Sequence, residues 1–173
     1  MKVILYMAVS ADGFIATKTD DTSWVSDTDW ENFKKLIEST GVIVVGKRTY
    51  DVGIADGTFP YAKALHIVMT HDKELIKQSL STIIFTDKDP RQIIKLAQLH
   101  HKDSLLVAGG GHTNGAFLKA GLINEIILSV HPIILGDGIK LFEGITLTKS
   151  LKLLDVKNLP ENLIQLHFQV SNN

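Results

Sequence analysis

The sequence contains no cysteine in 173 residues. Disulfide bonds, thiolate chemistry and the cysteine-ligated zinc of nucleobase deaminases are therefore excluded. A strong charge of either sign is also missing, because the formal net charge is only -1. This balance excludes the broad basic surface that binds nucleic acid, so any anion binding must be local. The seven histidines show no spacing typical of zinc ligands, and we expect no metal.

Long hydrophobic runs are missing too, since no apolar stretch approaches the roughly 20 residues that span a membrane. The opening segment 1–9 has a single positive side chain and a short apolar run that stops at Ser10. It predicts a first strand and not a signal peptide. Length and composition, 45% hydrophobic and 21% charged, fit one domain over 1–173. With no cysteine and no targeting segment, we expect a cytoplasmic protein.

Apolar runs rich in branched residues recur along the chain and predict strands that are buried on both faces. These runs are 3–9, 42–45, 65–69, 82–85, 105–108 and 126–130. Helical patterns lie between them, at 29–38, at 90–100 behind the N-cap Asp89, and at 113–120 before Gly121.

The alternation of strand and helix predicts an α/β fold with a mostly parallel central sheet. From residue 151 the apolar period becomes two, on both sides of segment 158–162. This change predicts a C-terminal antiparallel hairpin at one end of the sheet.

Two junctions, 43–49 and 106–113, each end an apolar run in glycine where a helix can begin. A helix start presents unpaired N–H groups and partial positive charge, and glycine lets an anion approach the backbone. Lys47 and Arg48 follow the first glycine and would suit an additional phosphate. The alternative is that these glycines only end strands and permit turns. Three consecutive glycines at 109–111, however, carry an entropy penalty that favours a functional reason, so the pattern indicates a nucleotide-phosphate cradle.

The segment 10–24 leaves the first strand through a turn and a polar stretch, and it ends at Trp24. A long loop that leaves a central strand is a natural lid over a crevice, although a plain surface connection is the alternative. Because a large aromatic side chain needs a place to pack, Trp24 favours the lid.

The segment 26–29, Ser-Asp-Thr-Asp, has the spacing of a capping box at a helix start. A functional alternative is that the Asp29 carboxylate points into a crevice and hydrogen-bonds a heterocyclic substrate. Beside an apolar floor its proton affinity would rise, and it could support protonation of a ring nitrogen. The strand 65–69 similarly ends at Thr70 and His71, which are either simple turn formers or ligands for a phosphate or ribose.

Together these segments resemble the dihydrofolate reductase-like superfamily, and within it the C-terminal reductase domain of bifunctional riboflavin-biosynthesis deaminase/reductases. The resemblance covers nearly the whole chain, in segments 9–16, 24–33, 45–49, 108–118 and 122–142. The glycine triplet followed by 116–118, combined with the later segment 135–138, is its most specific part. It implies a dihydrofolate reductase-like three-layer fold in which helices flank the sheet.

The resemblance implies an NADPH-dependent reductase and assigns residues to its cofactor. Ala8 and Ile15 would line the nicotinamide site. The other cofactor residues that it implies are Gly46, Gly109, Gly110 and Gly111 at the pyrophosphate, Lys47, Arg48 and Thr49 at the adenosine half, and Thr70 and His71 beside its 2′-phosphate. His112 and Thr113, which follow the glycine triplet, are also expected to bind the cofactor.

On the substrate side, Asp29 falls where dihydrofolate reductases hold their substrate-binding carboxylate, which makes it the candidate catalytic residue. Trp24, Phe33 and Lys63 are expected to bind substrate. The chain contains only two arginines, Arg48 and Arg91. Relatives hold anionic substrate groups with arginine or other basic residues, and lysine does not reproduce the planar clamp of arginine.

We therefore expect reduction of a small heterocyclic or ribosylamine substrate, most like 5-amino-6-(5-phosphoribosylamino)uracil reductase. The alternatives are a dihydrofolate or pterin reductase and a non-catalytic NADPH-binding module. Such reductase domains commonly pair, so the resemblance also implies a homodimer, for which the late apolar strands offer a surface.

Overall fold

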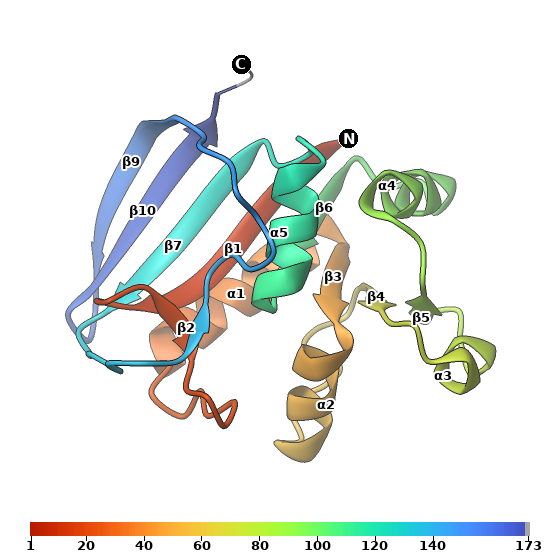
Figure 1. Cartoon of the computed structure of the whole chain (residues 1–173), viewed down its shortest axis with the longest axis horizontal. Helices are drawn as coiled ribbons and strands as arrows, with labels where there is room; N and C mark the ends of the chain where they lie inside the picture. The colour runs from red at the N-terminus through yellow and green to blue at the C-terminus, as the bar shows by residue number, and fades with distance from the viewer. Residues whose placement is uncertain (172–173) are drawn as a thin grey trace.

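The central sheet has the strand order β5-β4-β3-β6-β1-β7-β10-β9 in the computed structural model, which describes residues 1–171 (Figure 1). The strands are β1 (Lys2–Ser10), β3 (Val42–Gly46), β4 (Leu65–Met69), β5 (Ile83–Thr86), β6 (Ser104–Val107), β7 (Glu125–His131), β9 (Leu151–Leu159) and β10 (Leu163–Val170). The strands from β5 to β7 pair in parallel, whereas β10 runs antiparallel to both β7 and β9. The expected parallel sheet and C-terminal hairpin are both confirmed.

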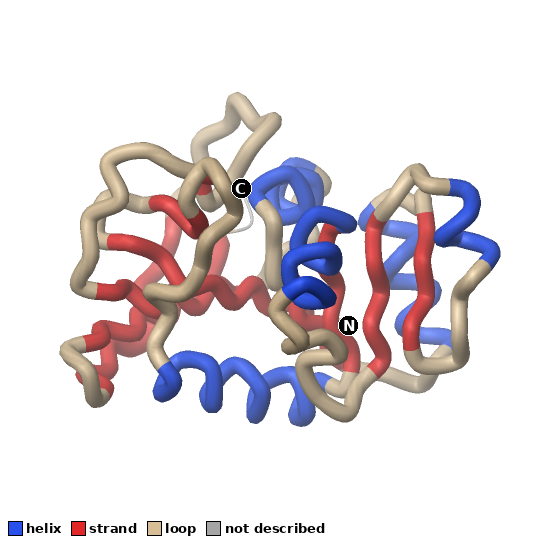
Figure 2. Tube along the Cα trace, turned by 90° about the horizontal axis from the view of Figure 1, so that it is seen from below, coloured by secondary structure: helices blue, strands red, loops and turns tan. Residues whose placement is uncertain are grey.

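Helices cover both faces of the sheet, as the view along its edge shows (Figure 2). They are α1 (Asp27–Thr40), α2 (Lys47–Ala55), α3 (Lys73–Lys77), α4 (Pro90–Leu99) and α5 (Gly111–Lys119). On β1, Val3 and Leu5 point to a core shared with α4 and α5, while Ile4 and Tyr6 point to a core shared with α1. This alternation is the period of two that a strand requires when both of its faces are buried. The three-layer α/β fold is therefore confirmed.

The helix starts follow local capping chemistry. At α4 the expected N-cap is present, because the Asp89 side chain accepts from the Gln92 N–H at 2.9 Å and the Gln92 side chain accepts from the Asp89 N–H at 3.1 Å. Helix α1 begins two residues before the predicted segment, because Ser26 Oγ accepts from the Asp29 N–H at 3.2 Å. Helix α5 also begins earlier than predicted, at Gly111. Apolar periodicity alone places a helix start less well than the cap does.

A second, small sheet pairs β2 (Phe14–Ala16) with β8 (Ile139–Lys140) in antiparallel fashion. It joins the segment after β1 to the segment after β7. Sequence patterns did not predict this sheet, because strands of two or three residues show no measurable period. No helix within residues 1–171 has the length and apolar character needed to cross a membrane.

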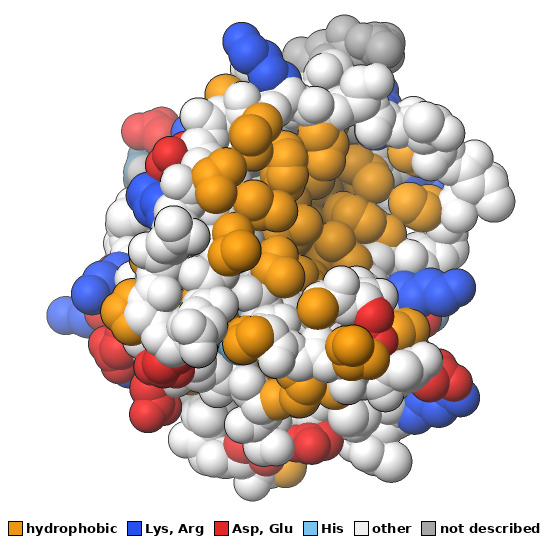
Figure 3. All heavy atoms as spheres, turned by 90° about the vertical axis from the view of Figure 1, so that its left-hand side faces the viewer, with side chains coloured by type: hydrophobic (Ala, Val, Ile, Leu, Met, Phe, Trp, Pro, Cys, Tyr) orange, Lys and Arg blue, Asp and Glu red, His pale blue; other side chains and the backbone are white. Residues whose placement is uncertain are grey.

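The hairpin of β9 and β10 leaves an apolar surface uncovered, which we call the β9–β10 face. Figure 3 shows hydrophobic side chains gathered in a hollow on this side of the molecule. The large exposed apolar side chains of the two strands are Leu151, Leu153, Leu154, Val156 and Ile164, with exposed fractions between 43% and 52%. Contiguous apolar surface of this kind typically marks an interaction site.

Candidate functional site

The two glycine junctions of the sequence lie side by side. Strands β3 and β6 are neighbours in the sheet. The Gly46 N–H donates to the Gly109 carbonyl at 2.8 Å, and the Ala108 N–H donates to the Val44 carbonyl at 3.0 Å. The structure therefore brings the starts of α2 and α5 to the same edge, at the carboxyl ends of the parallel strands, where ligands of open α/β sheets collect.

Both helices begin behind a glycine, with Gly46 as the N-cap of α2 and Gly110 as the N-cap of α5. Glycine has no side chain that could accept from the first-turn N–H groups, so these donors stay open to a ligand. A Cβ on Gly46 would lie 2.7 Å from Thr113 Oγ1, so glycine is what permits the close approach of the two helices. Gly109 has φ +95°, in the left-handed region that favours glycine. The two helix N-termini together offer partial positive charge of roughly half a unit each.

A cavity of about 410 Å³ opens in front of these helix starts. The predicted cofactor residues line it, with the exception of Ala8, which lies in the adjoining cavity. Those on its wall are Ile15, Gly46, Lys47, Arg48, Thr49, Thr70, His71, Gly109, Gly110, Gly111, His112 and Thr113. Segments far apart in the sequence thus meet around one concave space, which we call the cradle cavity.

Lys47 and Arg48 lie at the mouth of the cradle cavity and are paired with carboxylates. Lys47 Nζ lies 2.7 Å from Asp51 Oδ2, and Arg48 Nε lies 2.6 Å from Asp20 Oδ1. The hydrogen bond to Asp51 raises the pKa of the Lys47 ammonium. The side chains are 41% and 60% exposed, and exposed ion pairs contribute only about 0–1 kcal/mol. Either cation can therefore exchange its carboxylate partner for a phosphate at little cost.

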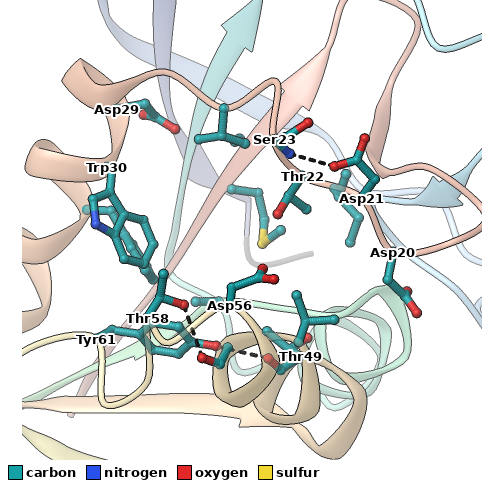
Figure 4. A pocket seen from close by; sticks show the side chains of 18 of the residues that line it. Asp20, Asp21, Thr22, Ser23, Asp29, Trp30, Thr49, Asp56, Thr58 and Tyr61 are labelled. Atoms are coloured by element: carbon teal, nitrogen blue, oxygen red, sulfur yellow. Dashed lines mark hydrogen bonds between the residues drawn. The ribbon is translucent and has the colours of Figure 1, made fainter.

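A larger cavity of about 970 Å³ adjoins the first (Figure 4). The two share wall residues from the sheet, the loop after β2 and α2, among them Met7, Ile15, Thr22, Arg48, Thr49 and Ala108. We call the larger space the aromatic cavity, because Trp30, Phe33 and Tyr61 form one of its walls. Residues 19–23 form another part of the wall, which is where a lid was expected. The two cavities together form one elongated site.

Asp29 lies at the inner end of the aromatic cavity and is 2% exposed. Its backbone N–H serves the Ser26 cap, while its carboxylate turns inward and accepts from the Tyr6 hydroxyl. The two interpretations of this segment are thus compatible, because the cap uses the backbone and leaves the carboxylate free to face the cavity. Burial raises the pKa of the Asp29 carboxyl, while hydrogen bonds from Ser129 and Tyr6 act against that rise.

A buried polar network holds the Asp29 carboxylate from behind. The Tyr6 hydroxyl lies 3.1 Å from Ser129 Oγ, and the Gln165 amide donates to these two oxygens at 3.4 and 3.3 Å. Burial and the neighbouring Asp29 raise the pKa of the Tyr6 phenol, so this hydroxyl keeps its proton and acts as a donor. Sequence reasoning missed Tyr6, Ser129 and Gln165, which come from three different strands. The signal that could have found Ser129 is a polar residue inside the apolar run 126–130.

His131 orients the start of α1 from the end of β7. Its Nε2 lies 3.2 Å from the Ser26 N–H, and its Nδ1 lies 3.0 Å from the Ser129 carbonyl. The first contact needs an acceptor and the second needs a donor, so the ring is the neutral tautomer with the proton on Nδ1. His131 therefore fixes the position from which Asp29 reaches the cavity.

Of the predicted substrate residues, the structure brings one to the cavity wall. Phe33 lines the aromatic cavity and stacks on Tyr6, with ring centroids 5.6 Å apart. Trp24 instead packs edge-on against His131 at 5.1 Å and lines neither cavity. Lys63 is exposed and also lines neither cavity. It lies two residues after Tyr61 and before the start of β4, outside both cavity walls.

The fold and this site define the chain as an α/β domain of the dihydrofolate reductase-like type, with a glycine-rich cradle beside a larger pocket. Residues 1–165 match the RibD C-terminal domain, and the chain belongs to that family.

Three relatives illustrate the similarity. The uncharacterized protein YwjB of Bacillus subtilis is 28% identical over 171 residues, which cover 96% of this chain and 97% of YwjB. The riboflavin biosynthesis protein RibD of Mycobacterium tuberculosis is 25% identical over 142 residues, 75% of this chain but 41% of RibD. A Thermotoga maritima structure named as a diaminohydroxyphosphoribosylaminopyrimidine deaminase/5-amino-6-(5-phosphoribosylamino)uracil reductase is 16% identical, with a TM-score of 0.79 over 98% of this chain and 56% of that one. The last likeness shows the shared fold.

Proposed function

We propose that this protein is an NADPH-dependent oxidoreductase that reduces a C=N or C=O bond in a small heterocyclic or ribosylamine substrate. The observation that carries the proposal is the meeting of two glycine-capped helix starts, joined by the Gly46–Gly109 hydrogen bond, beside two cations and next to a pocket with a buried carboxylate. Membership of the RibD C-terminal domain family supports the same class of reaction.

The cradle cavity fits a phosphorylated dinucleotide in its donor chemistry. Open N–H groups at the starts of α2 and α5 suit a pyrophosphate. Lys47 and Arg48 flank the space, and Thr70 and His71 at the end of β4 lie on the same wall. This combination of cations and hydroxyl groups suits a 2′-phosphate better than a free ribose hydroxyl pair. Ala8 and Ile15 would then face the nicotinamide, where the cradle cavity opens into the aromatic cavity.

The reaction needs a hydride and a proton. When bound, the reduced nicotinamide supplies the hydride to the substrate carbon and becomes oxidised, and the substrate nitrogen or oxygen takes one proton. The protein's part is to hold the substrate ring against the aromatic wall, exclude water beneath residues 19–23, and present a protonated or hydrogen-bonded carboxyl at Asp29. Burial favours the protonated Asp29 because it raises the pKa of that carboxyl.

Named relatives agree with this reaction type. The Thermotoga maritima protein carries the name of a 5-amino-6-(5-phosphoribosylamino)uracil reductase, and the Mycobacterium tuberculosis protein is named for riboflavin biosynthesis. We propose the same kind of hydride transfer for this chain. A non-catalytic NADPH-binding module is the alternative, and the experiment below separates the two.

Cofactor titration tests the proposal. NADPH should bind at least about tenfold more tightly than NADH, since each charged hydrogen bond to the 2′-phosphate contributes about 1.5–3 kcal/mol. Lys47→Ala and Arg48→Ala should weaken NADPH binding and leave NADH binding nearly unchanged. Lys77→Ala is the matched control, because Lys77 forms a similar exposed ion pair within its helix, with Glu74, and lines neither cavity.

Equal affinity for NADPH and NADH would show that Lys47 and Arg48 do not recognise the 2′-phosphate. Binding of NADPH with no oxidation by any pyrimidine, pterin or carbonyl compound would instead favour the non-catalytic module. Loss of the absorbance of the reduced cofactor is the measure of turnover.

A further inference from the structure

Charge is distributed unevenly between the two adjoining cavities. Carboxylates line the aromatic cavity, namely Asp20, Asp21, Asp27, Asp29, Asp51 and Asp56. Among the described residues on that wall, the cationic side chain is Arg48, and it is already paired with Asp20. The cradle cavity is evenly balanced, because Lys47 and Arg48 lie on its wall with two acidic residues, and the positive ends of α2 and α5 open into it. Electrostatic interactions therefore favour binding of an anion in the cradle cavity and disfavour it in the aromatic cavity.

Helix α2 reinforces this separation, because it runs from one cavity to the other. Its N-terminus at Gly46 borders the cradle cavity, and its C-terminal residues, with the C-cap Asp56, border the aromatic cavity. The C-terminus of a helix carries partial negative charge, to which Asp56 adds a full one. Figure 4 shows the Asp56 carboxylate pointing into the space beside Trp30, with Asp29 at the other side of that space.

The N-terminus of α1 also reaches the aromatic cavity, but it does not offer an anion site. Ser26 Oγ already occupies one first-turn N–H group, and Asp27 and Asp29 place two carboxyl groups on the first turn. Nor does the acidic wall form a metal site, since none of the described residues gather as three or more potential metal ligands. The carboxylates and the aromatic side chains are thus the surface that a substrate meets.

We propose that the aromatic cavity binds a substrate without a phosphate group, an uncharged or cationic amino-substituted nitrogen heterocycle of the pyrimidine or pteridine type. Its ring would lie against Trp30, Phe33 and Tyr61, and its ring and amino N–H groups would face the carboxylates. A phosphorylated sugar would place about two negative charges among these carboxylates, and Arg48, the cation on this wall, is assigned by the proposed function to the cofactor phosphate. This inference rests on the proposed function, and it narrows the substrate to the phosphate-free members of that class.

The test uses one pair of ligands that differ only in the phosphate, 5-amino-6-ribitylaminouracil and its 5′-phosphate, with binding followed by calorimetry. We expect the phosphate-free compound to bind at least tenfold more tightly at low salt, and the difference to shrink as salt screens the carboxylates. In the double variant Asp21→Asn/Asp56→Asn the difference should shrink at least threefold. Glu38→Gln is the matched control, since Glu38 is an exposed carboxylate of α1 that lines neither cavity.

Tighter or equal binding of the phosphate ester by the unaltered protein would overturn the inference, and so would an absence of binding by the phosphate-free compound at millimolar concentration. A difference that the double variant leaves unchanged would also overturn it. The proposed function is measured separately, by NADPH titration without either ligand. If the protein binds NADPH but prefers the phosphate ester, the proposed function stands and the inference is wrong. If the protein prefers the phosphate-free compound but binds no NADPH, the ligand preference of the cavity stands and the proposed function is wrong.

Discussion

Asp29 combines two tasks that the sequence presents as alternatives. Its backbone N–H completes the cap of α1 through Ser26, and its side chain is buried against Tyr6 at the end of the aromatic cavity. Burying a carboxyl group is unfavourable unless it is protonated or well hydrogen-bonded. The hydroxyl donors around it supply part of that compensation, and the remainder appears as a raised pKa. A carboxyl held in this way keeps its proton to a higher pH than an exposed one, which suits it to donate a proton to a substrate.

Replacing Asp29 by asparagine should lower kcat by about 100-fold, the lower end of what general acid catalysis contributes. The cap is retained because it uses the backbone. In the unaltered enzyme, kcat should fall as pH rises through the raised pKa of Asp29, whereas the variant should lose this dependence. The measurement is a pH profile of NADPH oxidation, with the exposed Glu31→Gln on the same helix as control. An unchanged rate and profile in the Asp29 variant would make the residue purely structural.

The same Asp29→Asn substitution, which lowers kcat, should raise the free energy of unfolding at neutral pH. Because burial raises the folded-state pKa of Asp29 above its ordinary value of 3.8, its contribution to stability is complete below about pH 4 and is lost as pH rises through the folded-state pKa. Asp29→Asn removes this loss. The variant should therefore be the more stable of the two proteins at pH 7, and its advantage should shrink toward pH 4. Denaturant unfolding at several pH values measures it, and an advantage that grows on acidification would contradict the prediction.

At the residue scale, the sequence predicts Asp29 as a site residue but does not predict the polar side chains that hydrogen-bond it. The spacing from Ser26 to Asp29 is local, so it can be recognised in one segment. Tyr6, Ser129 and Gln165 become neighbours only when β1, β7 and β10 pair, and no local pattern contains that information. For the same reason Trp24 was expected in the cavity, whereas packing against His131 from the distant β7 holds it elsewhere.

At the scale of elements, the glycine junctions are the best predicted part of the molecule. An apolar run that ends in glycine marks both the strand end and the helix start, so the cradle follows from two short segments. Helix α3 and the β2–β8 sheet were not predicted, because elements of two to five residues have too few positions to show a period.

Helix α5 owes its position to a glycine that intrinsic helix propensity disfavours. A Cβ on Gly115 would overlap the backbone carbonyl of Glu143, which cannot rotate aside as the end of a flexible side chain can. Alanine should stabilise an isolated helix by roughly 1 kcal/mol over glycine. Gly115→Ala should nevertheless destabilise the protein by about 1–3 kcal/mol through overpacking.

The neighbouring Ala116→Gly measures the propensity effect in the same helix together with the loss of one half-buried methyl group, without any overlap with Glu143. Chemical denaturation of both variants gives the comparison. A Gly115→Ala protein that is as stable as the original would show that the segment around Glu143 can move away.

At the scale of the whole molecule, the strand order decides which residues meet. The sequence predicts the strands and their parallel pairing, but not the order β3-β6-β1-β7 that places Gly46 beside Gly109 and Tyr6 beside Ser129. Strand order depends on which apolar faces pack together after the chain collapses, and runs that are apolar on both faces give little preference among neighbours. The resemblance implied a three-layer fold without a strand order, and the structure confirms that fold and adds the order.

The β9–β10 face exposes apolar side chains to solvent in a single copy of the chain, which is unfavourable. Register places Leu151, Leu153 and Val156 of β9 opposite apolar residues of β10, so both strands present one continuous apolar surface. Burying apolar surface gains roughly 25 cal/mol per Å², and a two-fold arrangement lets the same face cover itself. We therefore predict a homodimer in sedimentation velocity at micromolar concentration. Leu153→Lys/Val156→Lys should shift it to monomer without loss of folding, because both side chains are about half exposed.

Lys152→Glu separates the effect of the apolar face from that of charge on the same strand. Lys152 lies between Leu151 and Leu153 and pairs with Gln169, so the alternation of the strand turns it to the opposite face of the sheet. A dimer that tolerates Lys152→Glu and is lost in the double lysine variant would assign the contact to the β9–β10 face. An unaltered protein that sediments only as a monomer would refute the dimer and would require a different partner for this surface.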